Sequence, residues 1–457
     1  MPGATIFFPF PCIAVISLAK FLTQNTGRRK EEIDEGESLP GFSLSPLTFR
    51  SNMSQVLSNQ QLSDIAASFG TPTYVYHAER ITAQYQRLKE AFENVNATFF
   101  YACKALTNIN ILKHIKSIGC NIDCSSINEV HMALMAGFPP DKVLYTSSNI
   151  AFTEIETAKE LGVHINIDSL SNLEKFGKKY GHSYPVGIRV RPNIMAGGNL
   201  KISTGHNKSK FGIPLEDIDQ ILSIVKQTNL HINALHIHTG SEIKDVEVFA
   251  KGIEVLFDIA KYFPGLDIVD LGGGFKVPYI PGEEGTDIER LGKKVAEEFD
   301  LFENLHGKKL KVWFEPGKFL VSECGYLVTK VNVLKQSGDI RFAGIDSGLN
   351  HLIRPMFYGS YHRIENVSNP HGPMLSYTVV GNICETDTFA DSRMINEIRE
   401  GDLLVFYNAG AYGFEMSSNY NARFKPAEVL VKNDAYTLIR RRDTLQDMLN
   451  TQVLMEN

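Results

Sequence analysis

The sequence predicts an α/β domain followed by a β domain: a (β/α)8 barrel of the TIM type, then a mostly antiparallel β-barrel or sandwich. Apolar strand-like runs alternate with amphipathic helical stretches from residue 97 to about residue 320. The alternation repeats eight times, which is the number of units that closes a parallel barrel. After residue 320, strand-like runs follow one another with few helical intervals, as in antiparallel domains.

Length and composition indicate a globular protein of more than one domain. At 457 residues the chain exceeds one ordinary hydrophobic core. With a net charge of -6 it offers no basic surface for nucleic acid and no polybasic patch for a membrane. The six cysteines are scattered, and Cys120 and Cys124 lack the paired spacing of a zinc site. We therefore expect reduced thiols in a cytoplasmic protein.

Four segments are expected along the chain. They are a poorly ordered extension (1–52), a segment that contributes to the β domain (53–90), the barrel (91–320) and the C-terminal β domain (321–457). Residues 4–19 are apolar, but they contain prolines, are too short to span a membrane and follow no positive residue. A weak membrane anchor is the alternative for this stretch, and Met53 is a candidate for the true start.

Short apolar runs bounded by turn and cap residues are the candidate barrel strands. They cover residues 97–102, 121–125, 143–147, 164–168, 186–191, 234–239, 268–271 and 312–315. Helix starts are predicted by capping boxes at Ser126 with Glu129, Thr153 with Glu156, and Ser171 with Glu174. Helix ends are predicted at Gly119, Gly137, Gly162 and Gly177.

The predicted β domain has six strand-like runs. They cover residues 326–334, 342–345, 376–380, 402–407, 428–431 and 435–439. Residues 71–76 are also strand-like and precede the barrel. If they pair into the β domain, the two ends of the chain are fastened together.

Barrel active sites form at the C-terminal ends of the strands, so the residues at those positions are the first candidates for chemistry. Lys104 follows the first strand in the run YACKA. Taken alone, it fits a surface lysine whose stem covers the strand end. The other predicted strand ends, however, supply what a lysine–aldehyde cofactor would need. They carry Asp123, Ser125, Arg189, His238, Gly272, Gly273, Gly274 and Glu315.

Several of these positions allow two interpretations. The three glycines fit a phosphate-binding loop after strand seven or a tight turn. Glu315 ends an apolar strand, where a carboxylate needs a cationic partner, either a pyridinium nitrogen or Arg189. His236 and His238 point the same way on one strand. Three interpretations fit this pair: a metal site, an imidazole stacked on a cofactor, or two core histidines.

The β domain adds a second group of candidates. Arg354 and Tyr358 offer a guanidinium and a phenol in RPMFYGSYH (354–362). Cys384 stands beside Glu385 in CETD (384–387), and Tyr412 ends GAY (410–412). Each of these motifs alone is more often packing or surface than function, and only their joint occurrence indicates a site.

From about residue 65 to 445 the chain resembles diaminopimelate decarboxylases, which belong to the alanine-racemase-like class of pyridoxal-phosphate enzymes. The motifs that carry the resemblance are YACKA, HIHTGSE, DLGGGF, EPGK, RPMFYGSYH, CETD, GAY and YNARFKPAEVL, with the long run MAGGNLKISTGHNKSKFG. One departure is Lys318 in EPGK, where the family usually has arginine. Lysine carries the same charge as arginine but lacks the planar guanidinium group, which binds a carboxylate through two hydrogen bonds.

The resemblance implies roles for individual residues. Lys104 would form the Schiff base to pyridoxal 5'-phosphate, His238 would stack on its ring, and Glu315 would meet the pyridine nitrogen. Ser241, Gly272, Gly273, Gly274 and Tyr412 would hold the phosphate, with Asp123, Arg189, Gly317 and Lys318 also in the cofactor site. Lys318, Arg354, Tyr358, Glu385 and Tyr412 would bind substrate, and Cys384 would deliver a proton to the reacting carbon. No metal is expected.

The implied reaction is removal of CO2 from the D-centre of meso-2,6-diaminopimelate to give L-lysine, the last step of lysine biosynthesis. The implied assembly is a homodimer in which each β domain completes the partner's site. The alternatives are a decarboxylase of ornithine, arginine or carboxynorspermidine, then a racemase, and finally a non-catalytic pyridoxal-phosphate-binding protein.

Overall fold

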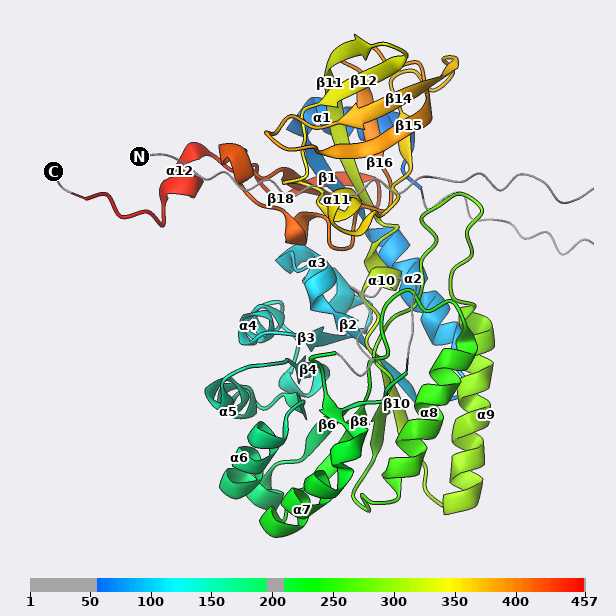
Figure 1. Cartoon of the computed structure of the whole chain (residues 1–457), viewed down its shortest axis with the longest axis vertical. Helices are drawn as coiled ribbons and strands as arrows, with labels where there is room; N and C mark the ends of the chain where they lie inside the picture. The colour runs from blue at the N-terminus through cyan, green and yellow to red at the C-terminus, as the bar shows by residue number, and fades with distance from the viewer. Residues whose placement is uncertain (1–55, 195–208, 456–457) are drawn as a thin grey trace, which may run out of the picture. The chain divides into compact units, whose positions relative to one another are not determined.

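The computed structural model describes residues 56–194 and 209–455 (Figure 1). The expectations for residues 1–52 and for Met53, and most of the motif that begins at residue 195, lie outside these residues. In the described part of the chain, no helix is both long enough and apolar enough to cross a membrane. The five cysteines of this part are unpaired, and only Cys384 among them is exposed.

The predicted parallel barrel is confirmed. Its eight strands are β2 (Ala97–Ala102), β3 (Asn121–Cys124), β4 (Val143–Thr146), β5 (His164–Ile167), β6 (Val186–Arg191), β8 (Ile232–His236), β9 (Ile268–Asp270) and β10 (Lys311–Phe314). Each pairs in parallel with its neighbours, and the pairing of β10 with β2 closes the ring. A two-residue strand, β7 (Ile213–Pro214), pairs with β6 outside this ring.

Amphipathic helices cover the outside of the strands (Figure 1). They are α2 (Ala78–Ala91), α3 (Ile109–Ser117), α4 (Ile127–Met135), α5 (Phe152–Glu160), α6 (Leu170–Tyr180), α7 (Ile218–Thr228), α8 (Val246–Ala260) and α9 (Ile288–His306). Each buries one apolar stripe, as Leu291, Val295 and Phe299 do on α9. This spacing of three or four residues is the one that faces a core. The other helices are α1 (Asn59–Phe69), α10 (Lys318–Val321), α11 (Arg354–Tyr358) and α12 (Leu445–Leu449).

None of the three predicted capping boxes forms in full, and two of them are misplaced. Helix α5 begins after Ala151, which makes no side-chain cap. Helix α6 begins after Ser169, whose hydroxyl accepts from the amide of Asn172. At α4 the Ser126 hydroxyl accepts from the Glu129 amide as expected, but the Glu129 carboxylate accepts from Ser125 instead of Ser126. Hydroxyl residues one or two positions inside a helix can mimic the sequence pattern of a cap.

Gly177 was also misassigned as a helix end. It lies inside α6, and α6 ends at Gly181, where φ is 52°. A Cβ at Gly177 would lie 2.3 Å from the Thr228 hydroxyl on α7. The glycine therefore permits close packing of two helices, which its position in the sequence does not reveal. Gly119, Gly137 and Gly162 do have the positive φ that favours glycine after a helix.

The second domain is a mostly antiparallel sheet, as predicted. Its strands are β1 (Thr73–His77), β11 (Gly325–Ser337), β12 (Ile340–Ile345), β13 (Ile364–Asn366), β14 (Met374–Val380), β15 (Thr388–Asn396), β16 (Leu403–Phe406), β17 (Ala427–Lys432) and β18 (Ala435–Arg440). Strand β1 lies between β11 and β17, so a strand that precedes the barrel is built into this sheet. The sequence missed β13, which has three residues, and β15, whose pairing is interrupted by irregularities.

Buried polar contacts join the second domain to the barrel. Glu428 on β17 is 1% exposed and accepts hydrogen bonds from the Tyr76 hydroxyl at 2.8 Å and the Asn108 amide at 3.0 Å. Glu415 accepts from the amide and hydroxyl of Thr107. Both contacts reach the segment between β2 and α3, the segment that also carries Lys104. The β domain thereby helps to fix the loop on which the site depends.

Candidate functional site

The C-terminal ends of the barrel strands surround a small cavity. Among the predicted site residues, those that line it are Lys104, His238, Ser241, Gly274, Glu315, Gly317, Lys318 and Tyr412. Tyr412 comes from the β domain, and its amide donates to the carbonyl of Ala105 at 2.9 Å. A loop of the β domain therefore reaches the barrel mouth of its own chain, whereas the resemblance implied that the β domain completes the partner's site.

Lys104 lies in a single 3-10 turn (Cys103–Ala105) directly after β2. Its Nζ is 3.2 Å from the Ser125 hydroxyl and 3.4 Å from Asp123 Oδ2. Burial acts to lower the pKa of Lys104, but the charge of Asp123 and its other acidic neighbours outweighs burial and raises that pKa. Burial and the charge of Glu315 raise the pKa of Asp123 to about 8, against the opposing effect of Lys104. The amine thus has a buried carboxyl group beside it.

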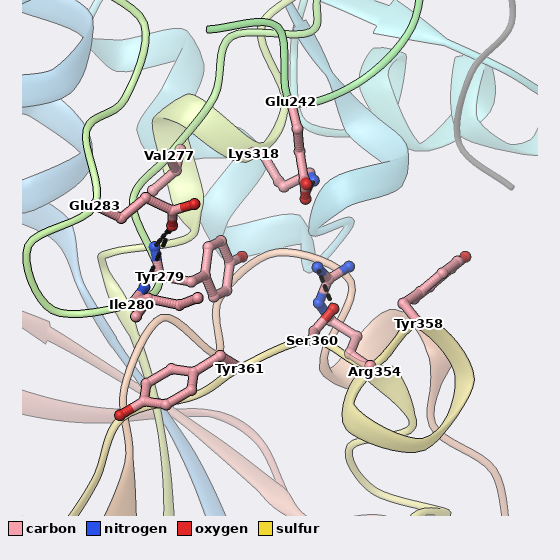
Figure 2. A pocket seen from close by; sticks show the side chains of 11 residues that line it. Glu242, Val277, Tyr279, Ile280, Glu283, Lys318, Arg354, Tyr358, Ser360 and Tyr361 are labelled. Atoms are coloured by element: carbon pink, nitrogen blue, oxygen red, sulfur yellow. Dashed lines mark hydrogen bonds and ion pairs between the residues drawn. The ribbon is translucent and has the colours of Figure 1, made fainter. Parts of the chain in front are cut away.

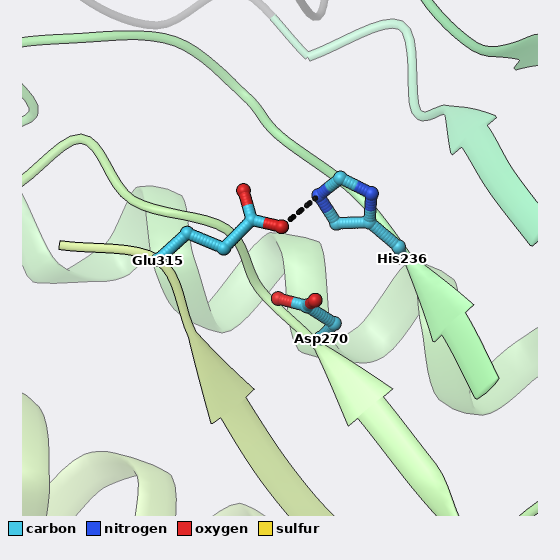
Figure 3. A group of neighbouring side chains, drawn as sticks. All are labelled: His236, Asp270 and Glu315. Atoms are coloured by element: carbon cyan, nitrogen blue, oxygen red, sulfur yellow. Dashed lines mark ion pairs between the residues drawn. The ribbon is translucent and has the colours of Figure 1, made fainter. Parts of the chain in front are cut away.

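Glu315 follows β10 and forms a buried group with His236 of β8 and Asp270 of β9 (Figure 3). Glu315 Oε1 lies 3.4 Å from His236 Nε2. One ring nitrogen of His236 and one carboxylate oxygen each of Asp270 and Glu315 all lie within 4.8 Å of one another. No ion pair joins Glu315 to Arg189 among the described residues. Arg189 is therefore not the cationic partner of Glu315, although the sequence allowed that interpretation. Arg189 instead faces the ring of Phe211 at 4.9 Å.

Glu315 is the ionised carboxylate of this group. Burial acts to raise its pKa, but its contact with His236 and the positive charge of Lys104 together lower it. The pKa of Asp270 is raised far above its usual value by burial and by the charge of Glu315. Two adjacent carboxyl groups seldom both ionise, so Asp270 holds the proton and Glu315 the charge. The contact of Glu315 Oε1 with His236 Nε2, at 3.4 Å, is the one that faces this buried oxygen.

The glycine loop packs tightly against His238. The Gly273 amide donates to His238 Nδ1 at 3.2 Å, and the Gly272 amide donates to Asp270 at 2.9 Å. Burial and Arg189 lower the pKa of His238 to about 3, so the imidazole is neutral, with its proton on Nε2. Two of the three amides expected to bind phosphate are thus used within the protein. Gly274 is the one that lines the cavity.

A second cavity of about 280 Å³ adjoins the first, and Lys318 lines both (Figure 2). Arg354 and Tyr358 of the predicted substrate set lie here with Ser360, whose hydroxyl accepts from Arg354 at 3.3 Å. The sequence did not indicate Glu242, which accepts from Lys318 Nζ at 2.7 Å. It also missed Tyr279 and Ser360. The position of Glu242 directly after Ser241 was the signal available for it.

Cys384 and Glu385 lie on a different part of the β domain. Cys384 is exposed, and its amide donates to Asn421 at 2.7 Å. Glu385 accepts from the Tyr420 hydroxyl at 2.8 Å. Within the described structure, neither residue lines either cavity of the barrel mouth. The described structure of a single chain therefore does not bring Cys384 and Glu385 to the cavities at the barrel mouth.

Comparison with known proteins identifies the family. Residues 78–322 match the pyridoxal-dependent decarboxylase, pyridoxal binding domain. The diaminopimelate decarboxylase of Methanothermobacter thermautotrophicus is 39% identical over 400 residues, which cover 85% of this chain and 93% of that protein. The chain belongs to the diaminopimelate decarboxylase family. A crystal structure of the Helicobacter pylori diaminopimelate decarboxylase complexed with L-lysine aligns with a TM-score of 0.78 and 30% identity. It covers 85% of this chain and 98% of that one.

A lysine/ornithine decarboxylase of Vibrio vulnificus shares the same fold, with a TM-score of 0.71 and 23% identity. Diaminopimelate decarboxylases use pyridoxal phosphate, and the residues in the smaller cavity fit that group. Lys104 offers an amine for the aldehyde, and Glu315 offers a buried, ionised carboxylate at the cavity wall for a protonated ring nitrogen. A Cβ at Gly317 would lie 3.2 Å from the Ala102 Cβ and 3.6 Å from the Tyr412 hydroxyl. A side chain at this position would therefore crowd two residues that line the cavity.

Proposed function

We propose that this chain removes CO2 from the D-centre of meso-2,6-diaminopimelate and yields L-lysine, with pyridoxal phosphate in the smaller cavity. One observation carries the proposal beyond family membership. The cavity with Lys104 opens beside a second cavity that holds both a guanidinium, Arg354, and a carboxylate, Glu242. A substrate that spans the two would present a carboxylate and an ammonium at its distal end, as diaminopimelate does.

The chain's own residues have distinct tasks in this reaction. Pyridoxal phosphate, when bound, supplies an electron-withdrawing ring that accepts the electrons left by the departing carboxylate. Asp123 and Ser125, 3.4 Å and 3.2 Å from Lys104 Nζ, hold the amine in position at the strand end. The ionised Glu315 holds a proton on the ring nitrogen. Arg354 binds the carboxylate at the distal end of the substrate.

The substrate assignment is tested with a panel of amino acids. We expect purified holoenzyme to release CO2 from meso-diaminopimelate, and far more slowly from ornithine, arginine or carboxynorspermidine. Those three lack a distal carboxylate next to an ammonium, so Arg354 would have no partner and its buried charge would remain uncompensated. The measurement is initial CO2 release at equal substrate concentrations. A preference for ornithine would contradict the assignment, and release from no substrate would favour a binding protein.

We further propose a two-fold homodimer in which Cys384 and Glu385 complete the site of the partner subunit. The support is their exposure on the β domain, away from both cavities of their own chain. A two-fold contact would make both sites equivalent. The unpaired cysteines support a reducing compartment, so we place the enzyme in the cytoplasm.

Complementation tests the shared site. Lys104→Ala and Cys384→Ala chains should each be nearly inactive and should regain activity when mixed. Random pairing makes half of the dimers mixed, and each mixed dimer has one intact site of two, so recovery should approach about a quarter of wild type. The matched control mixes Lys104→Ala with Glu315→Gln, which both damage the barrel, and should recover nothing. Lack of recovery after verified subunit exchange would show that each site comes from one chain.

A further inference from the structure

A loop of the β domain lies against the turn that carries Lys104. The amide of Tyr412 donates to the carbonyl of Ala105 at 2.9 Å. Further along both segments, the carboxylate of Glu415 accepts two hydrogen bonds from Thr107, one from the amide at 2.7 Å and one from the hydroxyl at 2.6 Å. These contacts fall one and three positions after Lys104, so the β domain holds the backbone beside the amine.

The turn relies on such contacts because it lies between β2 and α3, outside both the sheet and the helix. Within it, the Leu106 amide closes a single 3-10 turn on the Cys103 carbonyl at 3.1 Å. A backbone amide outside regular structure needs another partner, and for Thr107 that partner is the carboxylate of Glu415. Hydrogen bonds to a carboxylate are among the stronger ones in proteins.

The same β-domain loop supplies part of the wall of the smaller cavity. Tyr412 lines that cavity together with Lys104. The φ of Tyr412 is 56°, in the left-handed region where a residue with a side chain persists only if the surrounding structure holds it. The β domain thus fixes the phenol, and Glu415 ties the turn of the amine to the same loop.

Glu415 acts from outside this cavity. Among the described residues, neither Glu415 nor Thr107 lines a cavity at the barrel mouth. Both line a separate cavity, together with Lys425 and Arg440. Water in that cavity can take the place of the carboxylate as the acceptor for Thr107. Loss of Glu415 would therefore free the turn and leave the fold intact.

Glu428, the other carboxylate at this junction, has different targets. It is 1% exposed and accepts from the Tyr76 hydroxyl and from the side chain of Asn108. Tyr76 belongs to β1 of the same sheet, and Asn108 caps α3 by accepting from the Asn110 amide at 3.0 Å. Glu428 thus secures the sheet and the start of the helix, whereas Glu415 secures the turn.

We propose that Glu415 is a positioning residue: by holding Thr107, it fixes the turn of Lys104 so that the amine faces the aldehyde of pyridoxal phosphate. It acts through two hydrogen bonds and not through its charge. Asp123 and Ser125 hold the Nζ of Lys104, and Glu415 holds the backbone that carries it. The inference rests on the proposed function, since it takes Lys104 as the amine that binds the cofactor.

Two forms of the cofactor test the proposal on full-length protein freed of cofactor. Pyridoxal phosphate needs the amine, whereas pyridoxine phosphate has an alcohol in place of the aldehyde and binds without it. Glu415→Ala should weaken pyridoxal phosphate about tenfold, the scale of a lost hydrogen bond to a charged group, and pyridoxine phosphate much less. In fluorescence titration, the dissociation constant of pyridoxal phosphate divided by that of pyridoxine phosphate should therefore rise about tenfold.

Amide hydrogen exchange measures the turn itself. Exchange in the peptide that contains Thr107 should quicken about tenfold in Glu415→Ala. Glu415→Gln is the conservative variant, because its carbonyl can accept from the Thr107 amide and its NH2 group can donate to the Thr107 hydroxyl oxygen. It should return the ratio and the exchange to near the wild-type values. An effect as large as that of Glu415→Ala would show that the charge acts, which contradicts the proposal.

The matched control is Asp391→Ala in the β domain. Asp391 on β15 accepts from the Thr378 hydroxyl on β14 at 2.9 Å, so this change also takes a carboxylate from a threonine. Neither residue lines a cavity at the barrel mouth in the described structure, and the ratio should stay at the wild-type value. Circular dichroism melting shows whether each variant is folded.

An unchanged ratio or unchanged exchange in Glu415→Ala would overturn the inference, as would an equal rise of the ratio in Asp391→Ala. If Glu415→Ala does not fold, Thr107→Val carries the test, because it removes one of the two bonds and should raise the ratio severalfold. An unchanged ratio in that variant would overturn the inference equally. The proposed function fails on the wild-type protein alone, namely if it attaches no pyridoxal phosphate to Lys104 or releases no CO2 from meso-diaminopimelate.

Discussion

Lys104→Ala is expected to abolish covalent attachment of pyridoxal phosphate and to lower turnover by on the order of 10⁴-fold, as loss of a reacting group does. The physical reason is that Lys104 is the amine in the smaller cavity that has both a hydroxyl, Ser125, and a carboxyl, Asp123, within 3.4 Å of its Nζ. Borohydride reduction followed by mass spectrometry should find the pyridoxyl group on Lys104 in wild type and none on the variant.

The matched control is Lys318→Met, which removes the other lysine that lines this cavity. Lys318 Nζ is bound to Glu242 at 2.7 Å, so we expect this variant to retain the pyridoxyl group on Lys104. A pyridoxyl group on another lysine of Lys104→Ala would show that the covalent site is misassigned.

Glu315→Gln is expected to lower turnover by roughly 10²–10³-fold, the range for loss of a group aimed at a developing charge. Glutamine matches glutamate in size but carries no charge, so it cannot hold a proton on a ring nitrogen. Cofactor affinity should fall much less, because the other contacts of the cavity remain. The measurement compares turnover at saturating cofactor with the dissociation constant of pyridoxal phosphate from fluorescence titration.

Asp270→Asn is the control for that variant. The raised pKa of Asp270 means that the side chain is neutral near pH 7, and asparagine keeps the oxygen that accepts from the Gly272 amide. We expect a much smaller loss of turnover than for Glu315→Gln. Equal losses of turnover and cofactor affinity in Glu315→Gln would instead indicate a structural role beside His236.

The barrel could be predicted from the sequence because its strands are buried on both faces and each is followed by an amphipathic helix. Apolar runs such as residues 97–102 and 186–191 match β2 and β6 at both ends. The residues at strand ends were predictable for the same reason, since parallel strands bring their carboxyl ends to one mouth. Lys104, His238 and Glu315 all meet there.

Contacts between segments distant in sequence could not be predicted. The use of the Gly272 and Gly273 amides by Asp270 and His238 depends on how two loops pack. The pairing of Glu242 with Lys318 joins residues 76 positions apart. No local pattern indicates this pairing, because a glutamate after a serine is an ordinary loop sequence. The packing role of Gly177 against Thr228 was hidden for the same reason.

The stereochemistry of the product tests the central claim most directly. Holoenzyme is incubated with meso-diaminopimelate, CO2 is measured, and the lysine formed is separated by chiral chromatography. The account predicts one CO2 per substrate and L-lysine, because the distal L-centre lies in the cavity of Arg354 and Glu242 while the D-centre reacts beside Lys104. Formation of D-lysine would contradict this orientation, and recovery of unchanged substrate without CO2 would contradict the proposed reaction.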